Sequence, residues 1–196
     1  VEAITLLADL APTREDLRLA RRVKSDYFFD RFSRNAGNAT YQGLFNAPLL
    51  WNSNFFMSAE SMKILRLLTD VWLPDFKFGP GRCAVKLSRT PWYWETVTEN
   101  LLKIYAWGED FTIRHLVMPN HVDCCTRPVL EWLAQHMPDA PVNIMDQYRP
   151  DTFCDPQSSR YDDKYAEIAR RPTRQEVQQA YAYARELGLQ YEAIAY

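Results

Sequence analysis

Apolar and polar positions follow two periods from residue 48 onward, and the alternation of these periods predicts strands separated by helices. Short apolar runs predict strands at 48–51, 71–76, 112–118, 142–145 and 190–195. Apolar residues at helical spacing predict helices over 58–68, 91–105, 126–137 and 173–188. Strands that alternate with helices of this length are typical of a mostly parallel sheet with right-handed crossovers.

Residue types at the helix ends support these boundaries. Ser58 and Thr126 are N-cap residues by type, and Pro91 suits a first turn because its missing N–H has no partner there. Residues 173–176 read Thr-Arg-Gln-Glu, the pattern of a capping box, and Gly188 suits the end of the helix that follows.

The predicted fold class is therefore α/β, either an open doubly wound sheet or a partial (βα) barrel. Residues 48–196 form the predicted (βα) domain, and residues 1–47 a separate irregular or helical N-terminal region in which residues 13–16 start a basic amphipathic helix. The βα rhythm is interrupted near residues 23–48. Together with the absence of an initiator Met, this suggests an incomplete or processed chain, and an irregular N-terminal subdomain is the alternative.

Composition narrows the class of protein. The chain has 196 residues and a net charge of −2, which gives no reason to expect nucleic acid or an anionic membrane as a partner. We expect its four cysteines to be free thiols in a reducing cytoplasm, because a domain of this size does not need disulfides.

Asp75 and Lys77 are the leading candidates for ligand binding. Two residues apart at the end of a strand, they share a face, and the carboxyl ends of parallel strands are where α/β proteins bind ligands. An anion beside a cation at this edge suits a zwitterionic small molecule. The alternative is an ion pair that serves only the strand end.

Three further groups offer polar atoms at strand ends. Ser53 and Asn54 follow the first strand, where they suit either a polar ligand or a turn. Arg114 and His115 are neighbours on one strand, so only one of them can face the barrel interior, and a structural hydrogen bond is the alternative for either. Gln147 ends a strand face that begins at residue 143.

Cysteine and histidine side chains raise the question of a metal. His121, Cys124 and Cys125 have a spacing compatible with zinc, but adjacent cysteines do not easily reach one ion and no CxxC pair completes the set. An iron–sulfur cluster on Cys83, Cys124 and Cys154 would need three distant loops to converge. The sequence therefore favours no metal ligand.

Several sequence segments resemble the C-terminal half of radical S-adenosylmethionine (SAM) proteins related to pyruvate formate-lyase activating enzymes. They are Trp51–Asn54, Leu73–Lys77, Arg114–His121, Asn120–Trp132 and Met145–Pro150, in the family's order. The resemblance spans roughly residues 48–190. The family's cluster motif, CxxxCxxC, occurs nowhere in the chain.

The resemblance implies a partial radical-SAM barrel that binds SAM. A matching Asp-x-Lys helps to bind SAM in the family, a role carried over here to Asp75 and Lys77, whereas Ser53 and Asn54 match a Thr-Asn-Gly turn only loosely because Phe55 replaces the glycine. In the complete family protein a [4Fe–4S] cluster and SAM give a 5'-deoxyadenosyl radical, with a protein glycine as one substrate. Cluster ligands would have to lie in a missing segment. The alternative function is a cluster-less relative that binds SAM or another small ligand without catalysis.

Overall fold

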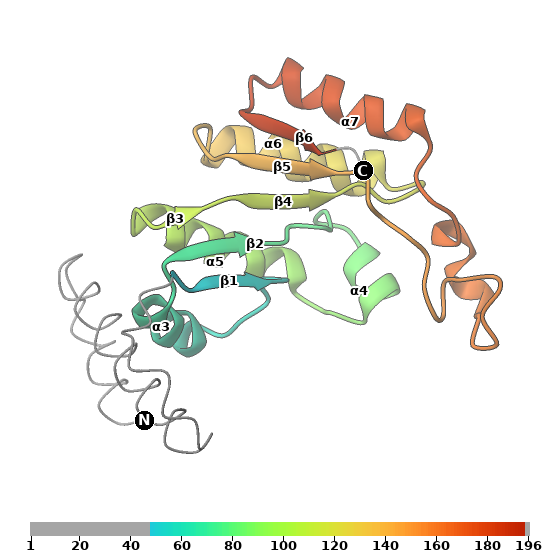
Figure 1. Ribbon diagram of the computed structural model, residues 1–196, viewed down its shortest axis with the longest axis horizontal. Coiled ribbons are helices and arrows are strands. Elements are labelled where there is room, and N and C mark those ends of the chain that lie inside the picture. The colour runs from blue at the N-terminus through green and yellow to red at the C-terminus, as the bar shows by residue number, and fades with distance from the viewer. Residues whose placement is uncertain (1–47, 195–196) are drawn as a thin grey trace, which may run out of the picture. The chain divides into compact units, whose positions relative to one another are not determined.

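The computed structural model of the protein describes residues 48–194, and in them strands and helices alternate along the chain (Figure 1). The strands are β1 (Leu50–Ser53), β2 (Val71–Pro74), β3 (Asp110–Phe111), β4 (Ile113–Leu116), β5 (Val142–Met145) and β6 (Tyr191–Ile194). The α-helices are α3 (Ala59–Leu68), α4 (Cys83–Ser88), α5 (Tyr93–Ala106), α6 (Arg127–His136) and α7 (Arg174–Glu186). The helix predicted near residue 13 lies outside the described residues.

The strands form two three-stranded sheets, in the orders β1-β2-β3 and β4-β5-β6. In the second sheet both pairs are parallel, with Ile113 opposite Val142 and Val142 opposite Tyr191. Burial alternates along β4: Ile113 and His115 are buried, and Arg114 takes the other face. The predicted α/β class with mostly parallel strands is confirmed.

Two compact units make up the described residues. The smaller comprises 48–51 and 57–72. Its helix α3 begins where predicted, because the Ser58 hydroxyl accepts a hydrogen bond from the Ser61 amide at 3.2 Å. Met62 and Trp72, which belong to this unit, are fully buried. The domain boundary predicted at residue 48 lies at the edge of the described residues and stays a prediction.

The larger unit comprises 52–56 and 73–194 and contains the residues considered below. Aromatic rings fill part of its interior: Phe76 contacts Trp94 and, edge-on, Trp132, with ring centroids 5.0 and 5.7 Å apart. These rings come from the end of β2, from α5 and from α6, so they join the sheet to two helices. No helix among residues 48–194 is long and apolar enough to cross a membrane.

The helix predicted over 126–137 is present as α6, but the side-chain cap predicted for Thr126 is wrong. Thr126 does not cap α6, because it lies inside a π-helical turn, η1 (Val122–Thr126), that runs directly into the helix. Its backbone is already helical, with φ −62°, and its hydroxyl is 2.9 Å from the Nε2 atom of His115. A threonine that is committed to a buried histidine is unavailable as a cap.

The predicted capping box at the start of α7 is confirmed. The Thr173 hydroxyl accepts a hydrogen bond from the Glu176 amide, and the Glu176 carboxylate accepts one from the Thr173 amide. We expect Thr173→Ala to lower the free energy of unfolding by about 1 kcal/mol, the usual cost of losing such a cap. Denaturant unfolding measures this effect, with Thr152→Ala, in a partly exposed turn, as the control. Equal stability of wild type and Thr173→Ala would contradict it.

Candidate functional site

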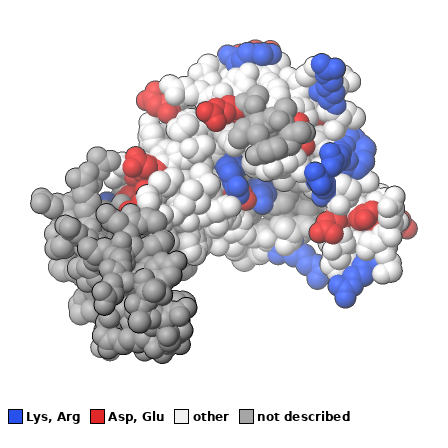
Figure 2. Space-filling model, viewed as in Figure 1, with Lys and Arg blue, Asp and Glu red and all other residues white. Residues whose placement is uncertain are grey.

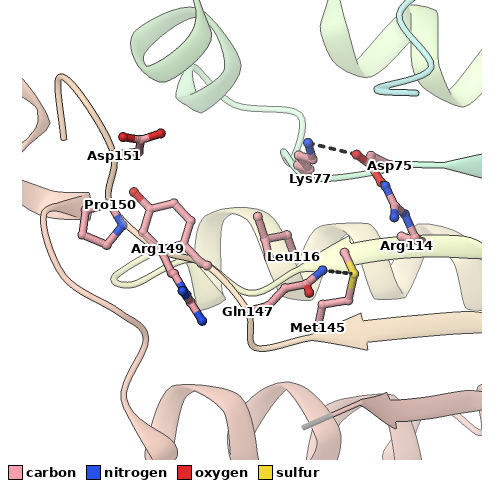
Figure 3. Close-up of a pocket in the computed structure, with 10 residues that line it drawn as sticks. Asp75, Lys77, Arg114, Leu116, Met145, Gln147, Arg149, Pro150 and Asp151 are labelled. Carbon is pink, nitrogen blue, oxygen red and sulfur yellow. Dashed lines mark hydrogen bonds and ion pairs between the residues drawn. The ribbon is translucent and has the colours of Figure 1, made fainter. Parts of the chain in front are cut away.

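A charged group lies where β2 and β4 meet. The Asp75 carboxylate accepts hydrogen bonds from Arg114, whose Nε is 2.7 Å from Oδ1, and pairs through Oδ2 with the Lys77 ammonium at 3.0 Å (Figure 3). Arg114 also donates to the Asn52 side-chain oxygen at 2.5 Å. The Asp75 side chain is about nine-tenths buried, whereas those of Arg114 and Lys77 retain 21% and 30% of their exposure. The carboxylate therefore holds two partly exposed cations.

Backbone contacts fix the positions of these side chains. Asp75 and Arg114 form a parallel bridge, and the Phe76 amide donates to the Arg114 carbonyl at 2.9 Å. The Tyr93 hydroxyl, on α5, donates to the Asp75 carbonyl and accepts from the Lys77 amide, both at 3.0 Å. Burial of Tyr93 raises the pKa of its hydroxyl, so it stays a protonated donor. Helix α5 thus holds the backbone at the end of β2 in place through the Tyr93 hydroxyl.

The charged group forms one wall of a cavity of about 600 Å³, a size typical of small-molecule sites. Its lining comes from the carboxyl ends of β2, β4 and β5 and from the segment after β5. The lining residues are Asp75, Lys77, Arg114, Leu116, Met145, Gln147, Tyr148, Arg149, Pro150 and Asp151. Apolar side chains line part of the wall, and both signs of charge are present, as they are on the described part of the face in Figure 2.

Two of the other sequence-predicted residues, Ser53 and Asn54, make local turn contacts and do not line the cavity. The side chains of Ser53 and Asn54 accept hydrogen bonds at 3.2 Å from backbone amides two residues ahead, which is the turn chemistry weighed for them. Phe55, whose amide donates to Ser53, is buried and has φ 60°, so the backbone at this position is left-handed. Gln147 does line the cavity, where it donates to the Met145 sulfur.

His115 faces the interior on the other side of β4. Its ring is fully buried, with Nδ1 2.7 Å from the Phe76 carbonyl and Nε2 2.9 Å from the Thr126 hydroxyl. Burial lowers the pKa of His115 to about 4, since the charged ring loses its hydration. Arg114 is therefore the member of this pair that lines the cavity, and His115 is a buried link between β4 and the residue that precedes α6.

Protonation of His115 gives stability a pH dependence. The unfolded chain binds a proton at this side chain below about pH 6.5, but the folded protein does so only near pH 4, so stability present above pH 6.5 is lost as the pH falls toward 4. We expect the free energy of unfolding to fall in this window by up to about 1.4 kcal/mol per pH unit for this proton.

Denaturant unfolding between pH 7 and 4 measures the slope. Replacing His115 by glutamine should reduce this slope by the contribution of one proton. An unaltered slope in the His115 variant would show that this side chain is not the titrating group.

The structure also brings together four side chains that the sequence prediction did not combine. Cys83 at the start of α4, and His121, Cys124 and Cys125 around η1, place their ligand atoms within 4.8 Å of one another. None of the four lines the cavity. The π-helical turn that gathers them leaves no recognisable signal in the sequence, and Cys83 is 41 residues from Cys124. Only the pairing of His121 with the two later cysteines was open to sequence reasoning.

Comparisons with known proteins show the fold and leave the family open. No protein-family model matches the chain. An uncharacterized protein of Methanocaldococcus jannaschii is 39% identical over 144 residues, covering 74% of this chain and 40% of that protein. The chain thus spans about two fifths of the length of the curated relative it matches. A solved domain of a pyruvate-formate lyase-activating enzyme from Bacteroides vulgatus is similar in structure, with a TM-score of 0.55 and 13% identity, over 89% of this chain and 94% of that domain.

Proposed function

We propose that the cavity binds S-adenosylmethionine and that the chain is the SAM-binding part of a radical SAM enzyme. The observation that supports it best is the Asp75–Lys77–Arg114 group, formed where the end of β2 bridges to β4. The fold likeness to an activating-enzyme domain points the same way.

The chemistry of this group fits the methionine end of SAM. That end carries an ammonium and a carboxylate on one carbon, so it needs an acceptor and a donor close together. Asp75 offers a carboxylate to the ammonium, and Lys77 and Arg114 offer cationic donors to the carboxylate. Leu116 and Met145 give the same cavity an apolar wall for the less polar part of a nucleoside. The residues present therefore suit binding and orientation of SAM.

The described cysteines do not fit a [4Fe–4S] cluster. The chain lacks CxxxCxxC. Each cysteine of such a cluster binds a different iron, yet the sulfurs of Cys83 and Cys125 lie only 3.6 and 3.9 Å from that of Cys124. Sulfurs this close suit one shared ion. We assign no cluster ligand among these residues and derive no reaction step through a cluster.

Isothermal titration of the chain with SAM tests the proposal. We expect saturable binding of one SAM, weakened about tenfold by Lys77→Ala, because a charge-assisted hydrogen bond is lost while Arg114 still meets the carboxylate. Lys164→Ala is the matched control, since Lys164 also pairs with an aspartate but lies outside the cavity. Free methionine should compete with SAM for the site. The affinity for adenosine should be the same in Lys77→Ala as in the wild type. Absence of SAM binding, or equal affinity in both lysine variants, would refute the proposed site.

A further inference from the structure

We propose that Cys83, His121, Cys124 and Cys125 bind a single zinc ion, which joins the loop after β2 to the turn after β4. This site is separate from the cavity, and it does not depend on the proposed SAM binding. Three thiolates and one imidazole form one of the common donor sets of structural zinc.

The spacing of the ligand atoms suits one tetrahedral ion. From the Cys124 sulfur, Nδ1 of His121 lies at 3.2 Å and the sulfurs of Cys83 and Cys125 at 3.6 and 3.9 Å. The Cys125 sulfur is 3.8 Å from Nδ1 of His121. Zinc bonds of about 2.3 Å to sulfur and 2.0 Å to nitrogen place neighbouring tetrahedral ligands about 3.5–3.8 Å apart. The four atoms therefore need only small shifts to enclose a zinc ion.

The π-helical turn explains how two adjacent cysteines reach one ion. His121 precedes η1, and its carbonyl accepts from the amides of Cys125 and Thr126 at 3.0 and 3.2 Å. Residues three and four positions apart on a helical turn face the same side, so Cys124 and Cys125 both lie on the side of His121. Such π-helical turns occur frequently at functional sites. On this backbone, adjacent cysteines can therefore both reach one ion, which the sequence spacing alone made difficult.

A second observation points to a ligand on His121. Its other nitrogen, Nε2, and the Glu167 Oε1 atom are buried without a hydrogen-bond partner, and they lie 3.6 Å apart. Zinc on Nδ1 would place the ring proton on Nε2, facing this carboxylate, which is the usual second partner of a metal-bound histidine. The other Glu167 oxygen pairs with Lys86 at 2.8 Å, which holds the carboxylate in place.

The loop before Cys83 packs closely against η1, the turn that contains Cys124 and Cys125. The Gly79 amide is hydrogen-bonded to the Cys125 sulfur. The Gly79 Cα packs so tightly on the Cys124 carbonyl that no side chain fits between them. Cys125 and His121 are buried, whereas Cys124 is exposed and gives a metal ion a route of entry. Four protein ligands leave no open position, so the role is structural.

Metal content tests this site. The full 196-residue chain, purified under reducing conditions, should hold about one zinc, and cobalt should replace it with the visible absorption and sulfur-to-metal charge transfer of a tetrahedral thiolate site. We expect Cys83→Ser and Cys124→Ser to lose the zinc and the cobalt spectrum. Cys154→Ser removes a cysteine outside the group and should keep both.

A ligand-preserving variant separates metal loss from misfolding. Cys124→His should retain cobalt with weaker charge transfer, because one thiolate is replaced by an imidazole, and circular dichroism checks the folding of each variant. Zinc content unchanged in Cys83→Ser and Cys124→Ser would overturn the proposal, as would equal loss in Cys154→Ser. A Cys83–Cys124 disulfide that persists after purification under reducing conditions, or iron with acid-labile sulfide in place of zinc, would overturn it too.

Discussion

Replacing Asp75 by asparagine is expected to weaken SAM binding about 100-fold, more than any other single change in the cavity. The ligand's ammonium loses its charged acceptor, a contact typically contributing about 1.5–3 kcal/mol. Arg114 and Lys77 also lose the carboxylate that holds them. Both the ligand and the two protein cations are therefore affected.

The same substitution should destabilise the protein without ligand. Removing one partner of a fully buried ion pair costs about 3–5 kcal/mol, and the partial exposure of Arg114 and Lys77 reduces this to roughly 2 kcal/mol. Asp139→Asn, at an exposed position in the loop before β5, is the control and should change neither quantity. If Asp75→Asn bound SAM as the wild type does, Asp75 could not be the acceptor for the ammonium.

Glycine 79 is the second position where a small change has a large expected effect. A Cβ added there would overlap the Cys124 carbonyl oxygen and lie 3.2 Å from the Cys125 Cα, and both are backbone atoms that cannot rotate away. We expect Gly79→Ala to lower the free energy of unfolding by about 3 kcal/mol, at the upper end of overpacking costs. Denaturant unfolding at neutral pH measures it.

Gly81 provides the matched control in the same loop. A Cβ at this position meets no atom within 4 Å, and its φ lies outside the left-handed region. Gly81→Ala should therefore leave stability unchanged or raise it slightly, by restricting the unfolded chain. Comparable losses in the two variants would show that the loop tolerates no alanine for reasons other than the Cys124 contact.

The fold was largely predictable because its signals are local. Strand β5 matches the apolar run at 142–145, and the start of α7 follows from the side-chain hydrogen bonds of one capping box. Period-two alternation also placed Asp75 and Lys77 on one face, and the ends of parallel strands then bring Arg114 to them. Thr126 misled the prediction because its hydroxyl bonds a distant histidine instead of its own helix.

Other parts of the molecule depend on contacts between distant segments. Tyr93 holds the end of β2 from a helix 16 residues later, and nothing in its local sequence distinguishes it from a core aromatic. Cys83 meets His121 and Cys124 in a loop whose Gly79 packs closely on the Cys124 backbone. Packing of this kind is decided by the folded structure, so a sequence pattern indicates the residue types but does not group them.

The most direct test of SAM binding is a nuclear magnetic resonance titration of the isotope-labelled chain with SAM. The account predicts saturable shifts of the backbone amides of Asp75 and Lys77, of Arg114 and Leu116, and of the segment 145–151, with those of residues 121–125 changing little. Saturable shifts confined to another part of the chain would place the ligand elsewhere. A spectrum that SAM leaves unchanged would contradict the claim that this cavity binds it.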